Sequence, residues 1–132
     1  MDRIELATEE STELIDITGE VKRIVKSKTV DSGICVIFTR HTTTGIIINE
    51  NEAGLKHDIA VLLNTLIPKG KGYQHDRIDD NAHAHLRSIM LGSSVTIPVE
   101  NGTLALGTWQ SIFFVECDGP RRREVCVSVV NG

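Results

Sequence analysis

Apolar positions recur along the chain with two different periods, and the period distinguishes the predicted helices from the predicted strands. Helical spacing predicts helices over residues 17–26, 53–67 and 81–91. Short runs rich in Val, Ile, Phe and Thr, bounded by turn residues, predict strands over residues 3–8, 33–40, 45–49, 94–99, 103–106, 111–116 and 124–130. Residues 68–80 are polar and turn-rich, and we expect a functional loop there because the segment is long for a simple connection.

The order of these elements predicts the fold class. Strand-helix-strand segments come first, and the chain ends in a block of hairpins joined through Asn101-Gly102 and Asp118-Gly119-Pro120 turns. This order is typical of α+β proteins in which a mostly antiparallel sheet packs with about three helices. The 132 residues suffice for one hydrophobic core and no linker divides them, so we predict a single compact domain over residues 1–132.

Composition narrows the class of protein. A net charge of -4 and 4% aromatic residues argue against nucleic-acid binding, which needs a basic surface and stacking side chains. No apolar run approaches the roughly 20 residues of a membrane span. We therefore expect a soluble, cytoplasmic protein without nucleic-acid or membrane partners. Cys35, Cys117 and Cys126 each lie in an apolar segment, which predicts reduced thiols in the core.

The segment 53–67 predicts an amphipathic helix with one buried face. Its apolar residues share one stripe: Leu55, Ile59, Leu62, Leu63, Leu66 and Ile67. His57 lies opposite this stripe, so we expect it in solvent. Asp58 lies nearer the edge of the stripe and is the more interesting polar residue.

Histidine is the first candidate for chemistry, because neutral imidazole binds metals and titrates near neutral pH. His41 follows an apolar strand and precedes a run of threonines that is equally typical of strand packing. His75 lies in the polar loop among carboxylates, and His85 lies on the helix 81–91. These residue types match a three-ligand zinc site, but no HExxH or CxxC spacing fixes its geometry.

The helix 81–91 is not able to direct both of its histidines to one site. His85 lies close to the direction of Ala82 and Ile89, whereas His83 points well away from it. His85 is equally well interpreted as a metal ligand and as a core histidine whose ring is hydrogen-bonded to a neighbouring carbonyl.

Three further polar or aromatic positions follow strand signals. Glu50 ends the strand 45–49 and is a candidate general base or metal ligand, with an exposed carboxylate as the plainer alternative. Trp109 is either a packed indole at a hairpin corner or an aromatic wall for a planar ligand. The cluster Arg121-Arg122-Arg123 suits a phosphate group, although a solvated charge run explains it equally well.

Several motifs occur in order: His41-Thr42-Thr43-Thr44, Asn49-Glu50-Asn51-Glu52, Tyr73-Gln74-His75-Asp76, Asn81-Ala82-His83-Ala84-His85-Leu86, Leu91-Gly92-Ser93-Ser94, Asn101-Gly102 and Leu106-Gly107-Thr108-Trp109-Gln110. Together they closely resemble the YjbQ-like family, over essentially the whole chain. That family is named for a secondary thiamine-phosphate synthase activity. The resemblance implies a compact α+β fold assembled as a homotrimer, with candidate sites near subunit boundaries.

The resemblance also implies a set of functional residues. The family's recurrent polar positions match His41, Glu50, Asp58, His75, His85, Trp109, Gln110 and Glu116, and Arg121 and Arg122 match a basic element after the last hairpin. We assign His41, His75 and His85 to a divalent metal, with zinc as the first choice and magnesium as the second. Catalytic roles fall to Glu50, Asp58 and Glu116, and substrate contacts to Thr42, Trp109, Gln110, Arg121 and Arg122.

The leading hypothesis is a metal-dependent enzyme that joins a pyrimidine-methyl diphosphate to a thiazole phosphate and releases diphosphate. Such a reaction needs electrostatic stabilisation of the leaving diphosphate and positioning of two flat rings. The expected partners are a small phosphorylated metabolite and two further copies of the chain. The alternatives are a non-catalytic trimeric module that binds a metal or an anionic metabolite, and a metal-dependent hydrolase of unknown substrate.

Overall fold

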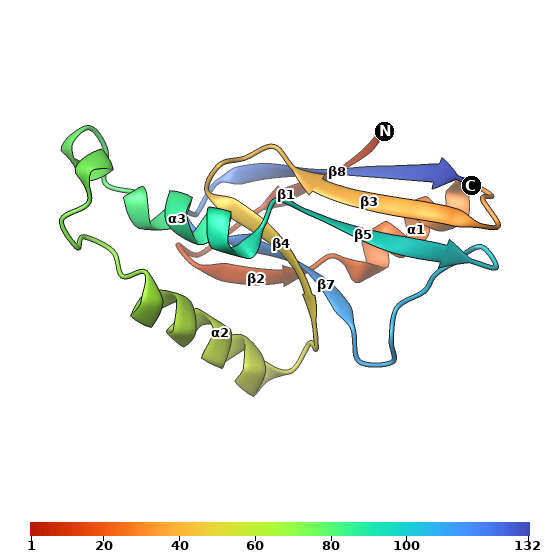
Figure 1. The fold of residues 1–132 in the computed structure, drawn as a ribbon, viewed down its shortest axis with the longest axis horizontal. Helices are drawn as coiled ribbons and strands as arrows, with labels where there is room; N and C mark the ends of the chain where they lie inside the picture. The colour runs from red at the N-terminus through yellow and green to blue at the C-terminus, as the bar shows by residue number, and fades with distance from the viewer.

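A computed structural model describes residues 1–132 and contains two antiparallel sheets, three α-helices and one short 3-10 helix (Figure 1). The elements follow one another as β1 (Asp2–Ala7), β2 (Glu13–Asp16), α1 (Thr18–Ser27), β3 (Gly33–Thr39), β4 (Thr44–Asn49), α2 (Ala53–Leu66), η1 (Gln74–Arg77), α3 (Ala82–Leu91), β5 (Ser94–Glu100), β6 (Thr103–Leu104), β7 (Ser111–Glu116) and β8 (Arg122–Asn131). The predicted α+β class with mostly antiparallel pairing is confirmed.

The two sheets form two layers. The larger has the strand order β1-β8-β3-β5-β6, and the smaller has the order β2-β7-β4. The larger of the two apolar clusters lies between the layers, because it joins Ile37 of β3 to Ile46 of β4 and Phe114 of β7. Helix α1 closes this core with Val21 and Val25, one turn apart on its buried face.

Strand β7 explains why the sequence of residues 111–116 is apolar at nearly every position. It is the central strand of its sheet, and both of its faces are covered. Phe114 points into the core between the sheets, whereas its neighbour Phe113 points to the opposite face, where it packs with Leu63 of α2 and Ala84 of α3. Alternate residues of one strand thus hold the two cores together.

The apolar stripe predicted for helix α2 is only partly buried. Leu63 is buried, but Leu62 and Leu66 are 54% and 56% exposed. Figure 1 shows α2 beneath the smaller sheet, joined to α3 by the segment that contains η1. The prediction of one buried face therefore holds only in part: Ile59 and Leu63 pack on the smaller apolar cluster, whereas Leu62 and Leu66 lie exposed in the single chain.

Helix α3 buries only part of the direction that Ala82 and Ile89 share, since Ala82 is buried but Ile89 is not. Ile89 is 77% exposed, whereas His83, Arg87 and Ser88 are buried. Hydrogen bonds satisfy two of these side chains: Arg87 Nε donates to the Ile67 carbonyl at 3.0 Å, and Ser88 Oγ donates to the Thr44 carbonyl at 2.5 Å. The Nδ1 atom of His83 is buried without a partner. The periodicity of apolar residues does not predict that a helix face made of polar residues will be buried.

Two elements were not predicted. Strand β2 has only four residues, Glu13–Asp16, with a carboxylate at each end, and η1 lies within the loop expected over residues 68–80. The three cysteines are free and buried, as predicted. No helix is long and apolar enough to cross a bilayer.

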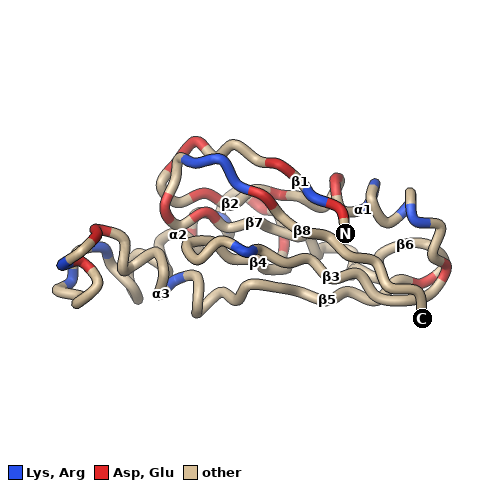
Figure 2. Tube along the Cα trace, turned by 90° about the horizontal axis from the view of Figure 1, so that it is seen from above, with Lys and Arg blue, Asp and Glu red and all other residues tan.

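Charge is unevenly placed along the molecule. In Figure 2, charged residues gather around the start of β8 and the connection from β1 to β2, whereas β3 and β5 run almost without charge. The start of β8 is where the arginine cluster of residues 121–123 lies. The candidate site lies at this end of the molecule.

Candidate functional site

A polar cleft forms where two connections cross from one sheet to the other. The β3–β4 connection leaves the larger sheet at Thr39 and enters the smaller one at Thr44, and the β7–β8 connection makes the reverse crossing. Thr44 pairs with Glu116, so both crossings lie at the same end of the fold. The start of α3 completes a cleft of about 360 Å³ lined by Arg40, His41, Thr42, Thr43, Asn81, His85, Asp118, Arg121 and Arg123.

The cleft is built against a buried ion pair between Glu116 and Arg123. The two side chains meet through two hydrogen bonds, from Arg123 Nε to Glu116 Oε1 at 2.8 Å and from Arg123 Nη2 to Glu116 Oε2 at 2.5 Å. The Thr8 hydroxyl and the Asp118 N–H also donate to this carboxylate, at 2.8 and 3.0 Å. Arg123 Nη2 further donates to Thr43 Oγ1 at 2.8 Å. The pair fixes the β7–β8 turn and the threonine run together.

Hydrogen bonding keeps Glu116 ionised. Burial raises the pKa of its carboxyl, but the hydrogen bonds from Arg123, Asp118 and Thr8 outweigh burial and hold the pKa below its ordinary value. The side chain is 0% exposed and accepts four hydrogen bonds. Glu116 was predicted as a catalytic residue, and its place in the structure is behind the cleft, where it holds Arg123.

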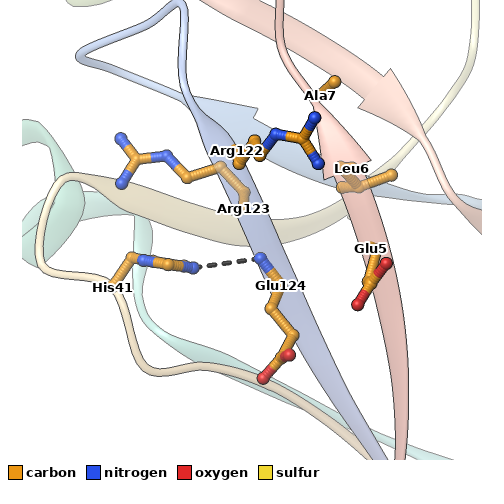
Figure 3. A pocket seen from close by; sticks show the side chains of 7 residues that line it. All are labelled: Glu5, Leu6, Ala7, His41, Arg122, Arg123 and Glu124. Atoms are coloured by element: carbon orange, nitrogen blue, oxygen red, sulfur yellow. Dashed lines mark hydrogen bonds between the residues drawn. The ribbon is translucent and has the colours of Figure 1, made fainter.

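His41 is held in one tautomer by the backbone of β8. Its Nε2 atom accepts a hydrogen bond from the Glu124 N–H at 3.0 Å, so the neutral ring carries its proton on Nδ1 (Figure 3). Burial lowers the pKa of His41, and the nearby charge of Arg123 lowers it further, which favours the neutral ring.

A second hollow, of about 370 Å³, is lined by residues of the paired strands β1 and β8 and by His41. Figure 3 shows that Arg122 and Arg123 point in opposite directions from β8, as consecutive strand residues must. Arg123 lines the polar cleft, whereas Arg122 lines only the hollow beside β1. The structure therefore puts Arg123, not Arg122, beside Arg121 in the cleft.

His75 and His85 lie next to each other. Their ring centroids are 4.8 Å apart and the rings are nearly perpendicular. His75 Nε2 is 3.1 Å from Asn81 Oδ1, and Asn81 Nδ2 donates to Asp118 Oδ2 at 2.9 Å. Of the three predicted metal ligands, His85 and His41 line the cleft, and His75 adjoins it through His85 and Asn81.

The polar cleft continues into a more apolar one. This third depression, of about 700 Å³, is walled by Phe38 and Ile89. It shares four lining residues with the polar cleft: Arg40, His41, Thr42 and His85. The hydroxyls of Thr39 and Ser88 line it too, but they are bonded to Thr44 within the protein. The depression therefore offers a ligand mainly van der Waals contact.

The remaining predicted residues lie elsewhere in the chain. Asn49 pairs with Ser111 at the opposite end of the β4–β7 ladder, about 17 Å from Thr44 at the rise per residue of a strand. Glu50, Trp109 and Gln110 adjoin that end, and Asp58 is exposed on α2. The cleft of one chain therefore includes His41, Thr42, His85 and Arg121 from the predicted set.

Sequence reasoning missed several residues of the cleft. Asp118 was interpreted only as part of a turn, and Arg40 was not singled out. Asn81, four residues before His85, is placed by helical spacing to orient the His85 imidazole, but the imidazole that it contacts is that of His75. No group of three or more His, Cys, Asp or Glu side chains is arranged to hold a metal ion. The Nε2 atoms of His41 and His75 have partners within the chain, at 3.0 and 3.1 Å.

Comparison with known proteins gives consistent matches along the whole chain. A family model described as UPF0047 protein YjbQ-like matches residues 2–132. A UPF0047 protein of Archaeoglobus fulgidus is 52% identical over 95% of this chain and 97% of its own, and UPF0047 protein YugU of Bacillus subtilis is 37% identical over 96% of each. A crystal structure from Sulfolobus solfataricus, described as a YbjQ-like protein of unknown function, has a TM-score of 0.97 and 42% identity, and covers 99% of this chain and 96% of that one.

Proposed function

The chain belongs to the UPF0047 YjbQ-like family, and from its cleft we propose that it is a transferase of the thiamine-phosphate synthase type acting on a phosphorylated metabolite. The observation that carries the proposal is the gathering of Arg40, Arg121 and Arg123 around His85 in one cleft. Guanidinium groups match phosphate oxygens in geometry and charge.

The arginines are preorganised for an anion. Arg121 donates through Nε to the Asp118 carbonyl at 2.8 Å and through Nη2 to Asp118 Oδ2 at 3.0 Å, and its Nη1 has no partner within the chain. Arg123 is fixed by Glu116, and Arg40 Nη2 lies 3.1 Å from Glu124 Oε1. Donors that are held in place before the reaction stabilise developing charge without reorganisation, which a departing diphosphate requires.

In the proposed reaction a ring nitrogen of the thiazole phosphate attacks the methylene carbon of the pyrimidine. The new C–N bond forms as the C–O bond to diphosphate breaks, and the bonding electrons leave with the diphosphate. Arg121 and Arg123 stabilise that charge. His85 takes no part in the hydrogen bonds of the cleft, so it is free to donate a proton to a diphosphate oxygen.

The apolar depression beside the cleft suits the ring of such a substrate. Phe38 and Ile89 provide contact area, and His41 and His85 lie at the junction with the polar cleft. A ligand with a flat body and a phosphate group would occupy both parts. Trp109 and Gln110 remain predictions for ring contacts, to be supplied by another subunit.

Metal binding and assembly are further parts of the proposal. Zinc, or failing that magnesium, remains the predicted ion for His41, His75 and His85, and no step above depends on it. The homotrimer remains a prediction, and the exposed apolar residues of α2, which are Val61, Leu62 and Leu66, offer a surface for contact between copies of the chain. Elemental analysis of unchelated protein and its mass in solution test these two points.

The function is tested by incubating the purified protein with the pyrimidine-methyl diphosphate and the thiazole phosphate and measuring thiamine phosphate. We expect product with the natural chain, at least about a hundredfold less with His85→Asn if proton donation has its usual weight, and an unchanged rate with the exposed control His57→Asn. Equal rates for His85→Asn and the natural chain would remove His85 from the mechanism. Diphosphate binding without product would favour the non-catalytic module.

A further inference from the structure

Asn81 occupies the N-cap of α3 but does not cap the helix. An asparagine at this position usually accepts a hydrogen bond from an N–H of the first turn. Here the side chain of Asn81 makes no such bond, and Asp76 Oδ1 instead accepts the Ala82 N–H at 3.1 Å. The carboxylate of η1 thus replaces the cap, and the Asn81 amide is free to do something else.

The released amide bridges an imidazole and a carboxylate. Asn81 is 7% exposed, its Oδ1 is 3.1 Å from His75 Nε2, and its Nδ2 donates to Asp118 Oδ2 at 2.9 Å. The same Asp118 oxygen accepts Arg121 Nη2 at 3.0 Å. A continuous chain of contacts therefore runs from His75 to the guanidinium that faces the cleft.

The negative charge of Asp118 determines which group donates and which accepts in each hydrogen bond of this series. Burial raises the pKa of Asp118, but hydrogen bonds from Asn81 and Arg121 outweigh it and hold the pKa below its ordinary value. An ionised carboxylate only accepts hydrogen bonds, so Asn81 must turn its NH₂ group toward Asp118 and its oxygen toward His75. The neutral ring of His75 must then carry its proton on Nε2.

We propose that Asn81 and Asp118 are positioning residues that couple the phosphate-facing Arg121 to the His75–His85 pair and hold His75 as the Nε2–H tautomer. The proposal rests on the proposed function only in its claim about the reaction. Asp118 orients Arg121 directly and His75 through Asn81, so the two residues have different consequences when they are replaced.

Asn81→Ala removes the bridge but leaves both Arg121 contacts to Asp118. His75 should then populate both neutral tautomers. The variant should lower kcat about tenfold or more, as the loss of an orienting partner commonly does, and should leave KM within about twofold. Asp118→Ala removes the acceptor of both Asn81 and Arg121. It should release the tautomer and also weaken binding of inorganic diphosphate about tenfold or more, because a charge-assisted contact loses its anchor.

The test begins with the natural chain, so that it does not depend on how a variant folds. Long-range ¹⁵N–¹H correlation spectra of histidine-labelled protein at neutral pH report which ring nitrogen carries the proton. We expect the Nε2–H pattern for His75, and an Nδ1–H pattern would overturn the proposal. The spectra of Asn81→Ala and Asp118→Ala should show mixed tautomers, with Asp80→Ala, an exposed carboxylate one residue from Asn81, as the matched control.

Titration with inorganic diphosphate separates this inference from the proposed function. If the natural chain binds no diphosphate but His75 shows the expected tautomer, the proposed function is rejected, whereas the proposed bridge from His75 through Asn81 to Asp118 is retained. A natural chain that makes product while Asn81→Ala keeps the tautomer and the natural kcat would overturn the positioning role and leave the function intact.

Discussion

The two ends of the β4–β7 ladder carry similar polar residues in very different surroundings. At the Thr44–Glu116 end, the carboxylate is wholly buried and accepts hydrogen bonds from Arg123, Thr8 and Asp118. At the Asn49–Ser111 end, Trp109 is 73% exposed, and the Gln110 amide accepts only a local hydrogen bond from the Gly107 N–H at 2.8 Å.

The difference follows from how the chain leaves each end. At the first end both connections cross between the sheets, so side chains from β8, α3 and the segment that follows β1 surround the strand ends. At the second end, β4 leads to α2, and β7 is reached through an exposed connection that follows β6. Only the first end is preorganised, and preorganised polar groups are what electrostatic catalysis uses.

Breaking the buried ion pair between Glu116 and Arg123 should have the largest effect, and it acts at the Thr44–Glu116 end of the ladder. We expect Arg123→Met to lower the free energy of unfolding by about 3–5 kcal/mol, because it leaves the Glu116 carboxylate buried without its charge partner. Urea denaturation measures the change. The neighbouring exposed Arg122→Met should change stability by less than about 0.5 kcal/mol.

A double variant distinguishes the lost pair from general disruption at this position. Glu116→Leu combined with Arg123→Met removes both charges, and it should recover much of the lost stability because no unpaired ion remains. If the double variant is less stable than Arg123→Met alone, the buried charge of Glu116 is not the cause of the loss.

The next largest effect concerns ligand binding at the same end. Arg121→Met should weaken binding of inorganic diphosphate about tenfold or more, since a hydrogen bond to a charged group contributes about 1.5–3 kcal/mol. Stability should change little, because the Arg121 side chain is 54% exposed. Calorimetric titration checks this prediction, and unchanged affinity would place the anion elsewhere.

Much of the fold was predictable because its signals are local. The periodic residues of α1 and the long apolar run of β7 determine those elements without knowledge of the rest of the chain. Strand β2 was missed because four residues with acidic ends give no such signal. The exposed stripe of α2 was predicted as buried because periodicity shows which residues share a face but not what covers it.

The site was less predictable because it depends on register and on polar partners. Arg122 was assigned to the phosphate although Arg123 lines the cleft, and only the pairing of β8 decides which of two consecutive residues faces inward. Asp118 carries an ordinary turn signal, and helical spacing places Asn81 near His85, whereas the structure has it in contact with His75. Their bridge between His75 and Arg121 joins segments 37 residues apart and leaves no periodic trace.

Acidification should produce a smaller effect, through the buried His83. Burial lowers the pKa of His83 below its ordinary value of 6.5, and the positive charges of Arg87 and Lys69 lower it further, against the opposite influence of Asp118 and Asp76. Folding therefore favours the neutral ring. This contribution to stability is fully present above pH 6.5 and is lost as the pH falls through the lower folded pKa.

We expect the free energy of unfolding to fall between pH 6.5 and pH 5, and His83→Asn to reduce that slope. The slope that remains should come from His41, whose pKa is also lowered by burial. His57→Asn, at an exposed position, should leave the slope unchanged. Urea denaturation over this pH range gives the slopes, and equal slopes for His83→Asn and the natural chain would show that His83 is not linked to folding.

The smallest effect is expected at the Asn49–Ser111 end of the ladder. Trp109→Ala should change the free energy of unfolding by less than about 0.5 kcal/mol, because an indole that is 73% exposed has little packing to lose. Affinity for inorganic diphosphate should stay within about twofold, since the arginines proposed to bind it lie about 17 Å away along the strand. A tenfold loss of diphosphate affinity in Trp109→Ala would contradict the separation of the two ends. It would mean that the indole of a neighbouring subunit contacts the diphosphate itself and not only the ring of the substrate, and that the Asn49–Ser111 end is ordered by assembly rather than by the fold of the single chain.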